Sequence, residues 1–173
     1  MTFRVLVLVV GAAAFAALPA QAQKRGSVEV GAFTAYMNAD NSLPVGNALG
    51  FGGRVGVSAM PWLSFEVDIA HASKNGATHR PMHLWLVYNV PPTSRAELFG
   101  GIGYVHNKYS GSYEASDNGV GGLVGVRQRF GKMLAVRLDG HADFMPNSAN
   151  KSYLISYNGN WGLGIGVSAL LNR

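Results

Sequence analysis

His141 stands between two carboxylates in a pattern that could support acid–base chemistry. Asp139 and Asp143 lie two residues to either side of it, and residues two apart in a strand point to the same face. A carboxylate can orient an imidazole as a general base, and a serine on an adjacent strand would complete a triad. The alternative is a buried histidine held by its carboxylates. We favour that alternative and predict no catalytic residue.

Other residue types that bind metals are present without a spacing that fits a metal site. His71, His79, His83 and His106 fall mostly at predicted strand ends and loops, although imidazole is the commonest protein ligand for zinc and copper. The segment 117–119, Asp-Asn-Gly, resembles part of a calcium loop but lacks its alternating acidic ligands. We predict a turn there, and neither a metal nor a cofactor.

The composition describes one domain with little charge. The chain has 173 residues, no cysteine and 23 glycines, and charged residues make up 13% of it. This balance is typical of a protein that places much of its surface outside water. The net charge of +5 and the pI near 9.7 could indicate a nucleic-acid partner. Because the lysines and arginines are scattered, we predict no nucleic-acid binding.

The first residues have the pattern of an export signal. Arg4 precedes the apolar run 5–18, and Ala20-Gln21-Ala22 is a small-x-small cleavage motif. We therefore predict a signal peptide over residues 1–22 and a mature domain over residues 23–173. The alternative is an uncleaved anchor, but the apolar run is shorter than the ~20 residues that a spanning helix needs.

The mature chain alternates between apolar and polar residues with the period of a β-strand. In the segment 63–72, for example, Leu63, Phe65 and Val67 alternate with Ser64, Glu66 and Asp68. Seven further segments follow the same pattern, some of them less clearly. The total of eight is an even number, as a closed bacterial barrel requires. The eight predicted strands are 27–37, 50–59, 63–72, 80–90, 96–106, 119–130, 134–144 and 161–169.

The connections between these segments alternate between short and long. Residues 60–61, 91–95 and 131–133 predict tight turns, and residues 38–48, 73–79, 107–118 and 145–151 predict longer polar loops. Short periplasmic turns and long outer loops are typical of bacterial barrels. We therefore predict an all-β fold, an eight-stranded antiparallel up-and-down transmembrane β-barrel.

Side-chain volumes decide which face points outward. An eight-stranded barrel has an interior just wide enough for side chains, so the face that mixes Gly, Ser and Ala with a few ionic groups suits the lumen. Aromatic residues also fall into two expected belts, with Tyr36, Phe51, Tyr104, Phe144 and Tyr153 near the outer rim and Trp62, Tyr88 and Phe130 near the periplasmic rim. The predicted lumen charges are Arg54, Arg127, Arg129, Arg137, Glu29, Glu66, Asp68, Glu97, Asp139 and Asp143. We expect them to form ion pairs that hold the barrel closed.

Four segments, the glycine-rich strand 100–104, the run 121–126, the strand 135–140 and the closing strand 161–167, resemble the small outer-membrane barrels related to the OmpA transmembrane domain. The resemblance covers the whole mature chain and implies membrane anchoring or surface exposure without a defined active site. The full OmpA architecture adds a periplasmic peptidoglycan-binding domain, which we do not expect in this chain.

The sequence therefore predicts a bacterial outer-membrane protein with a structural, surface-interaction or adhesion-type role and a packed, non-conducting lumen. Expected partners are outer-membrane lipid and lipopolysaccharide, with an external ligand at the loops 38–48 and 107–118. The second of these loops carries Tyr109, Tyr113 and Glu114. The alternatives are a lipid-modifying enzyme, a narrow pore and a soluble barrel that carries an apolar ligand.

Overall fold

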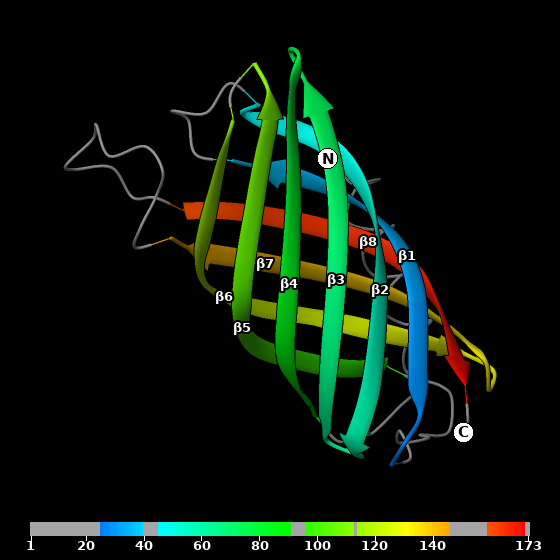
Figure 1. Cartoon of the computed structure of the whole chain (residues 1–173). Helices are drawn as coiled ribbons and strands as arrows, with labels where there is room; N and C mark the ends of the chain where they lie inside the picture. The colour runs from blue at the N-terminus through cyan, green and yellow to red at the C-terminus, as the bar shows by residue number, and fades with distance from the viewer. Residues whose placement is uncertain (1–24, 40–44, 91–95, 113, 146–158, 172–173) are drawn as a thin grey trace, which may run out of the picture.

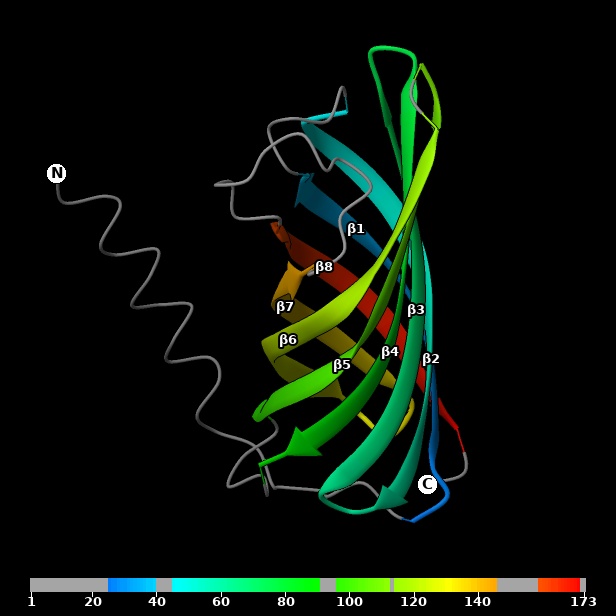
Figure 2. The same ribbon diagram turned by 60° about the vertical axis from the view of Figure 1, so that its left-hand side comes forward.

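The computed structural model describes residues 25–39, 45–90, 96–112, 114–145 and 159–171. In these ranges the chain forms a closed barrel of eight antiparallel strands, each paired with its neighbours in sequence, and β1 closes against β8 (Figures 1 and 2). The strands are β1 (Val28–Asn38), β2 (Asn47–Met60), β3 (Leu63–Lys74), β4 (Ala77–Asn89), β5 (Ala96–Gly111), β6 (Ala115–Phe130), β7 (Leu134–Phe144) and β8 (Gly159–Leu171). The predicted fold class and strand number are confirmed. None of the described residues forms a helix long and apolar enough to cross a membrane. The predicted signal peptide, residues 1–22, lies outside the described residues.

Two predicted long loops are wrong, because the strands continue through them. β3 and β4 meet at Asn75 and Gly76, whose φ angles are 53° and 74°, the geometry of a tight type I′ hairpin turn that favours Asn-Gly. β5 runs to Gly111 and β6 begins at Ala115, so residues 107–118 are mostly strand. The predicted turn at 117–119 is therefore wrong as well, and Asp117 is a strand residue paired with Asn107.

The two ends of the barrel differ. At the terminal end, where β1 begins and β8 ends, β2–β3 and β6–β7 are joined by tight turns as predicted. The predicted turn 91–95 and the loop residues 40–44 and 146–151 lie outside the described residues. At the opposite end, here called the hairpin end, the β3–β4 and β5–β6 hairpins project past the neighbouring strands (Figures 1 and 2).

The barrel wall separates two kinds of side chain, as the alternation predicted. Outward residues are large and apolar, and many are more than 40% exposed, such as Phe65, Ile102 and Leu163. The described members of both predicted aromatic belts point outward. Trp161, which the prediction omitted, lies beside Tyr36 with ring centroids 5.7 Å apart, and Trp62 lies beside Tyr88 at 6.1 Å. Tyr153 lies outside the described residues.

Candidate functional site: the polar lumen and the basic rim

The terminal half of the lumen is filled by an ion-pair network centred on Arg127. This side chain is fully buried. Its Nη2 lies 2.9 Å from Glu29 Oε2 and 3.4 Å from Glu66 Oε1, and its Nη1 lies 3.1 Å from Glu97 Oε2. Arg129 Nη2 lies 2.6 Å from the same Glu97 oxygen. One guanidinium therefore links carboxylates from three different strands across the barrel.

Arg137 extends the network toward the middle of the lumen. Its Nη1 donates to Glu66 Oε2 at 2.7 Å and its Nε donates to Asp139 Oδ2 at 2.8 Å. Arg54 Nη2 lies 3.0 Å from that Asp139 oxygen. Arg137 also stacks on Phe99, with its guanidinium carbon 4.0 Å from the ring centroid. Every charged residue predicted to face the lumen is buried there, and these contacts confirm that the predicted lumen residues form ion pairs with one another.

A second polar cluster lies nearer the hairpin end and is built around His83. Its Nδ1 lies 2.7 Å from Asp68 Oδ1, and its Nε2 lies 3.3 Å from Asp143 Oδ2. Trp85 Nε1 donates to the other Asp68 oxygen at 2.7 Å, and the Trp85 ring stacks on the imidazole at 4.9 Å. Asp68 is thus held by His83 and Trp85, which lie two residues apart on β4. His83 links Asp68 on the adjacent strand β3 to Asp143 on β7.

His141 belongs to this cluster but has the weaker carboxylate contact. Its Nε2 lies 3.9 Å from Asp143 Oδ2, and its ring lies 4.9 Å from that of His83. Its partners on the adjacent strands are Leu123 and Gly162. Neither is a serine, so the described strands bring no nucleophile into register with His141. The spacing of Asp139, His141 and Asp143 suggested a triad, but the described residues opposite His141 do not supply its serine.

The histidines separate into two groups that the sequence did not distinguish. His79 and His83 are buried in the lumen, whereas His71 and His106 lie on the outer surface of the wall. Ligand atoms of His83, His141 and Asp143 lie within 4.8 Å of one another, a proximity that residues far apart in the sequence do not reveal. Since both His83 nitrogens already contact carboxylates, the arrangement is that of a charge network.

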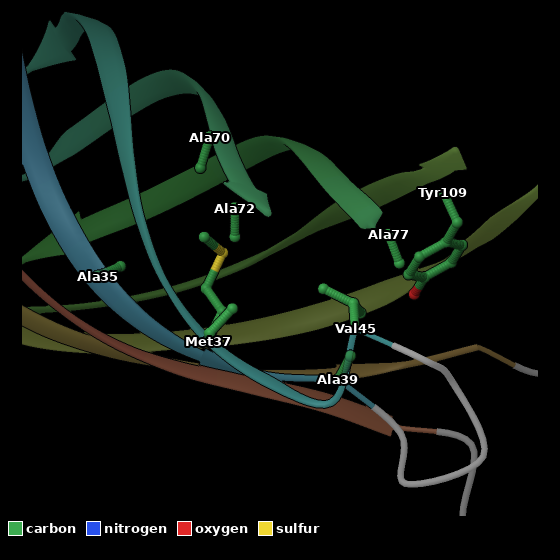
Figure 3. Close-up of a cluster of buried hydrophobic side chains, with 9 residues drawn as sticks. Ala35, Met37, Ala39, Val45, Ala70, Ala72, Ala77 and Tyr109 are labelled. Carbon is green, nitrogen blue, oxygen red and sulfur yellow. The ribbon is translucent and has the colours of Figure 1, made fainter. Parts of the chain in front are cut away.

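A small cavity lies between the two clusters in the described part of the barrel. It has a volume of about 10 Å³ and lies between Arg54, Asp68, His83, Asp139 and His141, which is room for about one water molecule. At the hairpin end the lumen is lined by small apolar residues and Met37, with Tyr109 reaching across (Figure 3). Tyr109 is therefore buried, whereas the sequence had placed it on an external loop.

Cations gather on the outer surface of the wall near the hairpin end. Arg80 on β4 and Lys108 on β5 are exposed and directly opposite each other. Arg80 Nε donates to His71 Nδ1 on β3 at 3.3 Å. We call His71, Arg80 and Lys108 the basic rim. The sequence did not reveal this group, because its members become neighbours only through strand pairing.

Comparisons with known proteins agree on one fold. The N-terminal β-barrel domain of Pseudomonas aeruginosa OprF superposes with a TM-score of 0.66 at 15% identity, over 86% of this chain and 100% of that chain. Neisserial surface protein A gives 0.61 at 18% identity, over 83% and 95%. The attachment invasion locus protein Ail of Yersinia pestis gives 0.55 at 11% identity, over 85% and 99%, and that protein is also known in complex with the heparin analogue sucrose octasulfate.

At these identities the structural likeness establishes the fold. No curated protein sequence matches the chain. The model of the outer membrane protein β-barrel domain matches residues 5–168, which is most of the sequence. The chain therefore belongs to the family of outer membrane protein β-barrel domains and is a protein of the bacterial outer membrane.

Proposed function

We propose that this protein is a structural or surface-interaction component of the outer membrane whose lumen is packed and does not conduct. The observation that carries the proposal is the buried Arg127, which contacts Glu29, Glu66 and Glu97 from three strands. An eight-stranded barrel has little space beyond its own side chains, and this network occupies that space. The hairpin end would face the outside, and residues 1–22 would be removed on export, with cleavage after Ala22.

Planar-bilayer recording tests the packed lumen. The purified, folded barrel is expected to give no steady conductance at 1 M KCl. A variant with Arg127→Ala and Glu97→Ala, which removes two of the plugging side chains, serves as a comparison. Regular single-channel openings of the unmodified protein would refute a non-conducting lumen, provided that its heat-modifiable gel mobility shows a closed barrel.

A catalytic role is the rival proposal, and the surroundings of His141 argue against it, because Leu123 and Gly162 flank it on the adjacent strands. We expect His141→Ala and Asp139→Asn to leave the lipid A composition of cells unchanged. Mass spectrometry of extracted lipid A measures this directly. A modified lipid A species that disappears in either variant, at equal protein level, would favour an enzyme.

The projecting hairpins support the surface-interaction part of the proposal. Ail, a structural neighbour, is known with a sulfated sugar bound, and in this chain Lys74 lies at the outer end of β3. We therefore propose that a polyanionic ligand binds at the hairpin tips. Calorimetric titration with sucrose octasulfate is expected to show binding that Lys74→Gln weakens and Lys132→Gln, at the opposite end, does not. Equal affinities for the two variants would contradict it.

A further inference from the structure

The lipid-facing surface of the wall is hollowed over β3–β6. The hollow has a volume of about 810 Å³ and is lined almost entirely by apolar atoms. Its outward side chains include Phe65, Val67, Leu84, Ile102, Tyr104 and Val120. We call it the β3–β6 groove. Its size is in the range of pockets that hold small molecules, and a hydrocarbon chain matches its chemistry.

Two glycines explain why the wall recedes here. An added Cβ at Gly103 would lie 2.5 Å from the Trp85 ring, and one at Gly121 would lie 2.7 Å from it. Any larger residue at either position would collide with the indole. The β5–β6 wall can therefore lie directly against Trp85, whose position is held by its bond to Asp68. The shape of the groove therefore follows from close packing of the β5–β6 wall against Trp85, a member of the lumen cluster around His83.

The basic rim lies beyond the hairpin-side end of the groove, with Met82 and His106 between them. Along β4 the outward residues run from Leu86 and Leu84 through Met82 to Arg80, and on β5 Tyr104 is followed by His106 and Lys108. Apolar residues therefore give way to cations at the same level on neighbouring strands. A ligand that lies in the groove and extends past Met82 and His106 would reach Arg80 and Lys108.

Among the described residues, no carboxylate forms an ion pair with the basic rim. Arg80 and Lys108 are paired across the two strands, and like charges placed directly opposite destabilise a sheet. In the described part of the chain neither forms an ion pair, and Arg80 bonds only to the His71 imidazole. Glu114, the carboxylate in the described part of the β5–β6 tip, lies beyond this level. The charge pattern favours an anion from outside the chain.

We propose that the β3–β6 groove and the basic rim together bind one phosphorylated, acylated lipid of the outer leaflet. An acyl chain lies along Leu84, Ile102 and Val120, and a phosphate lies between Arg80 and Lys108, which bind phosphate through charge-assisted hydrogen bonds. The inference rests on the proposed function, in which the hairpin end faces the outer surface. It adds a defined lipid-binding site to the proposed structural or surface-interaction role.

Native mass spectrometry of the folded barrel in detergent micelles, titrated with diphosphoryl lipid A, tests the site. We expect the unmodified protein to retain one lipid. The combined variant Arg80→Gln and Lys108→Gln is expected to bind at least about tenfold more weakly, because it loses two charge-assisted contacts. Leu84→Trp, which fills the groove from the lipid side, should weaken binding similarly. Lys132→Gln at the other end and Leu163→Trp on β8 are the matched controls and should bind normally.

Chemically trimmed ligands separate the two halves of the site. Lipid A stripped of both phosphates should bind about as weakly to the unmodified protein as diphosphoryl lipid A binds to the rim variant. Equal binding of the stripped lipid, normal binding by either site variant, or complete displacement by inorganic phosphate alone would overturn the proposal. Channel recording of the same preparation keeps the two proposals apart, since a conducting barrel that still binds lipid would refute only the packed lumen.

Discussion

Two pairs of cations face each other across neighbouring strands, one in the lumen and one on the outer surface. Arg127 and Arg137 are directly paired between β6 and β7, and Arg80 and Lys108 are directly paired between β4 and β5. The first pair is buried and shares Glu66, whose Oε1 contacts Arg127 and whose Oε2 contacts Arg137. The second pair is exposed, and neither cation contacts a carboxylate of the described chain.

The difference separates charges that stabilise the fold from charges available for binding. A buried cation without a partner is strongly penalised, so the lumen pair can exist only with carboxylates supplied by other strands. An exposed pair costs little, because solvent and salt screen it. The rim can therefore carry like charges without internal neutralisation. Substitutions in the two pairs should therefore change the free energy of unfolding by different amounts and in opposite directions.

The largest effect is expected for Arg127→Met. The variant leaves Glu29, Glu66 and Glu97 with fewer partners in a buried space, and breaking a buried pair by removing one partner costs about 3–5 kcal/mol. Urea unfolding in lipid vesicles, followed by heat-modifiable gel mobility, measures the free energy of unfolding. Lys132→Gln in the exposed turn is the control and should change it by less than about 0.5 kcal/mol. A comparable loss in the control would mean that the assay does not report the network.

A smaller effect is expected for Glu66→Gln, which keeps the shape of the side chain but removes the charge that Arg127 and Arg137 share. Because Glu97 and Asp139 still contact these arginines, we expect a loss of about 1.5–3 kcal/mol, the contribution of a hydrogen bond to a charged group. The same unfolding assay applies. An unchanged midpoint would show that the lumen pair tolerates its own repulsion, and the contrast with the rim would fail.

The smallest effect, of opposite sign, is expected for Arg80→Gln. Relief of the repulsion from Lys108 should raise the free energy of unfolding by roughly 0.2–1 kcal/mol at low salt, and the gain should shrink as salt is added. A double-mutant cycle with Lys108→Gln isolates the interaction. Clear destabilisation by either single substitution would mean that the basic rim stabilises the fold, as the lumen pair does.

The alternation of apolar and polar residues was sufficient to predict the barrel, but not how far the strands extend at its hairpin end. β7 lies where the alternation predicted it, because Val136, Leu138 and Phe144 face outward while Arg137 and Asp139 face the lumen. The Asn75–Gly76 hairpin was missed because its polar residues were interpreted as a loop, although Asn-Gly is the favoured pair for a type I′ turn. The β5–β6 extension was missed for the same reason, since Asn107 and Asp117 are polar yet point into the lumen.

The sequence by itself determined which residues face lipid and which face the lumen, because a strand alternates its side chains with a period of two and the two faces differ in size and charge. Only the tertiary structure decided which lumen residues meet. His83 contacts Asp68 and Asp143, and Arg80 faces Lys108, because closure of the barrel and the register of its strands bring distant residues to one level. Those contacts, and not the alternation, define the ion network and the lipid site proposed here.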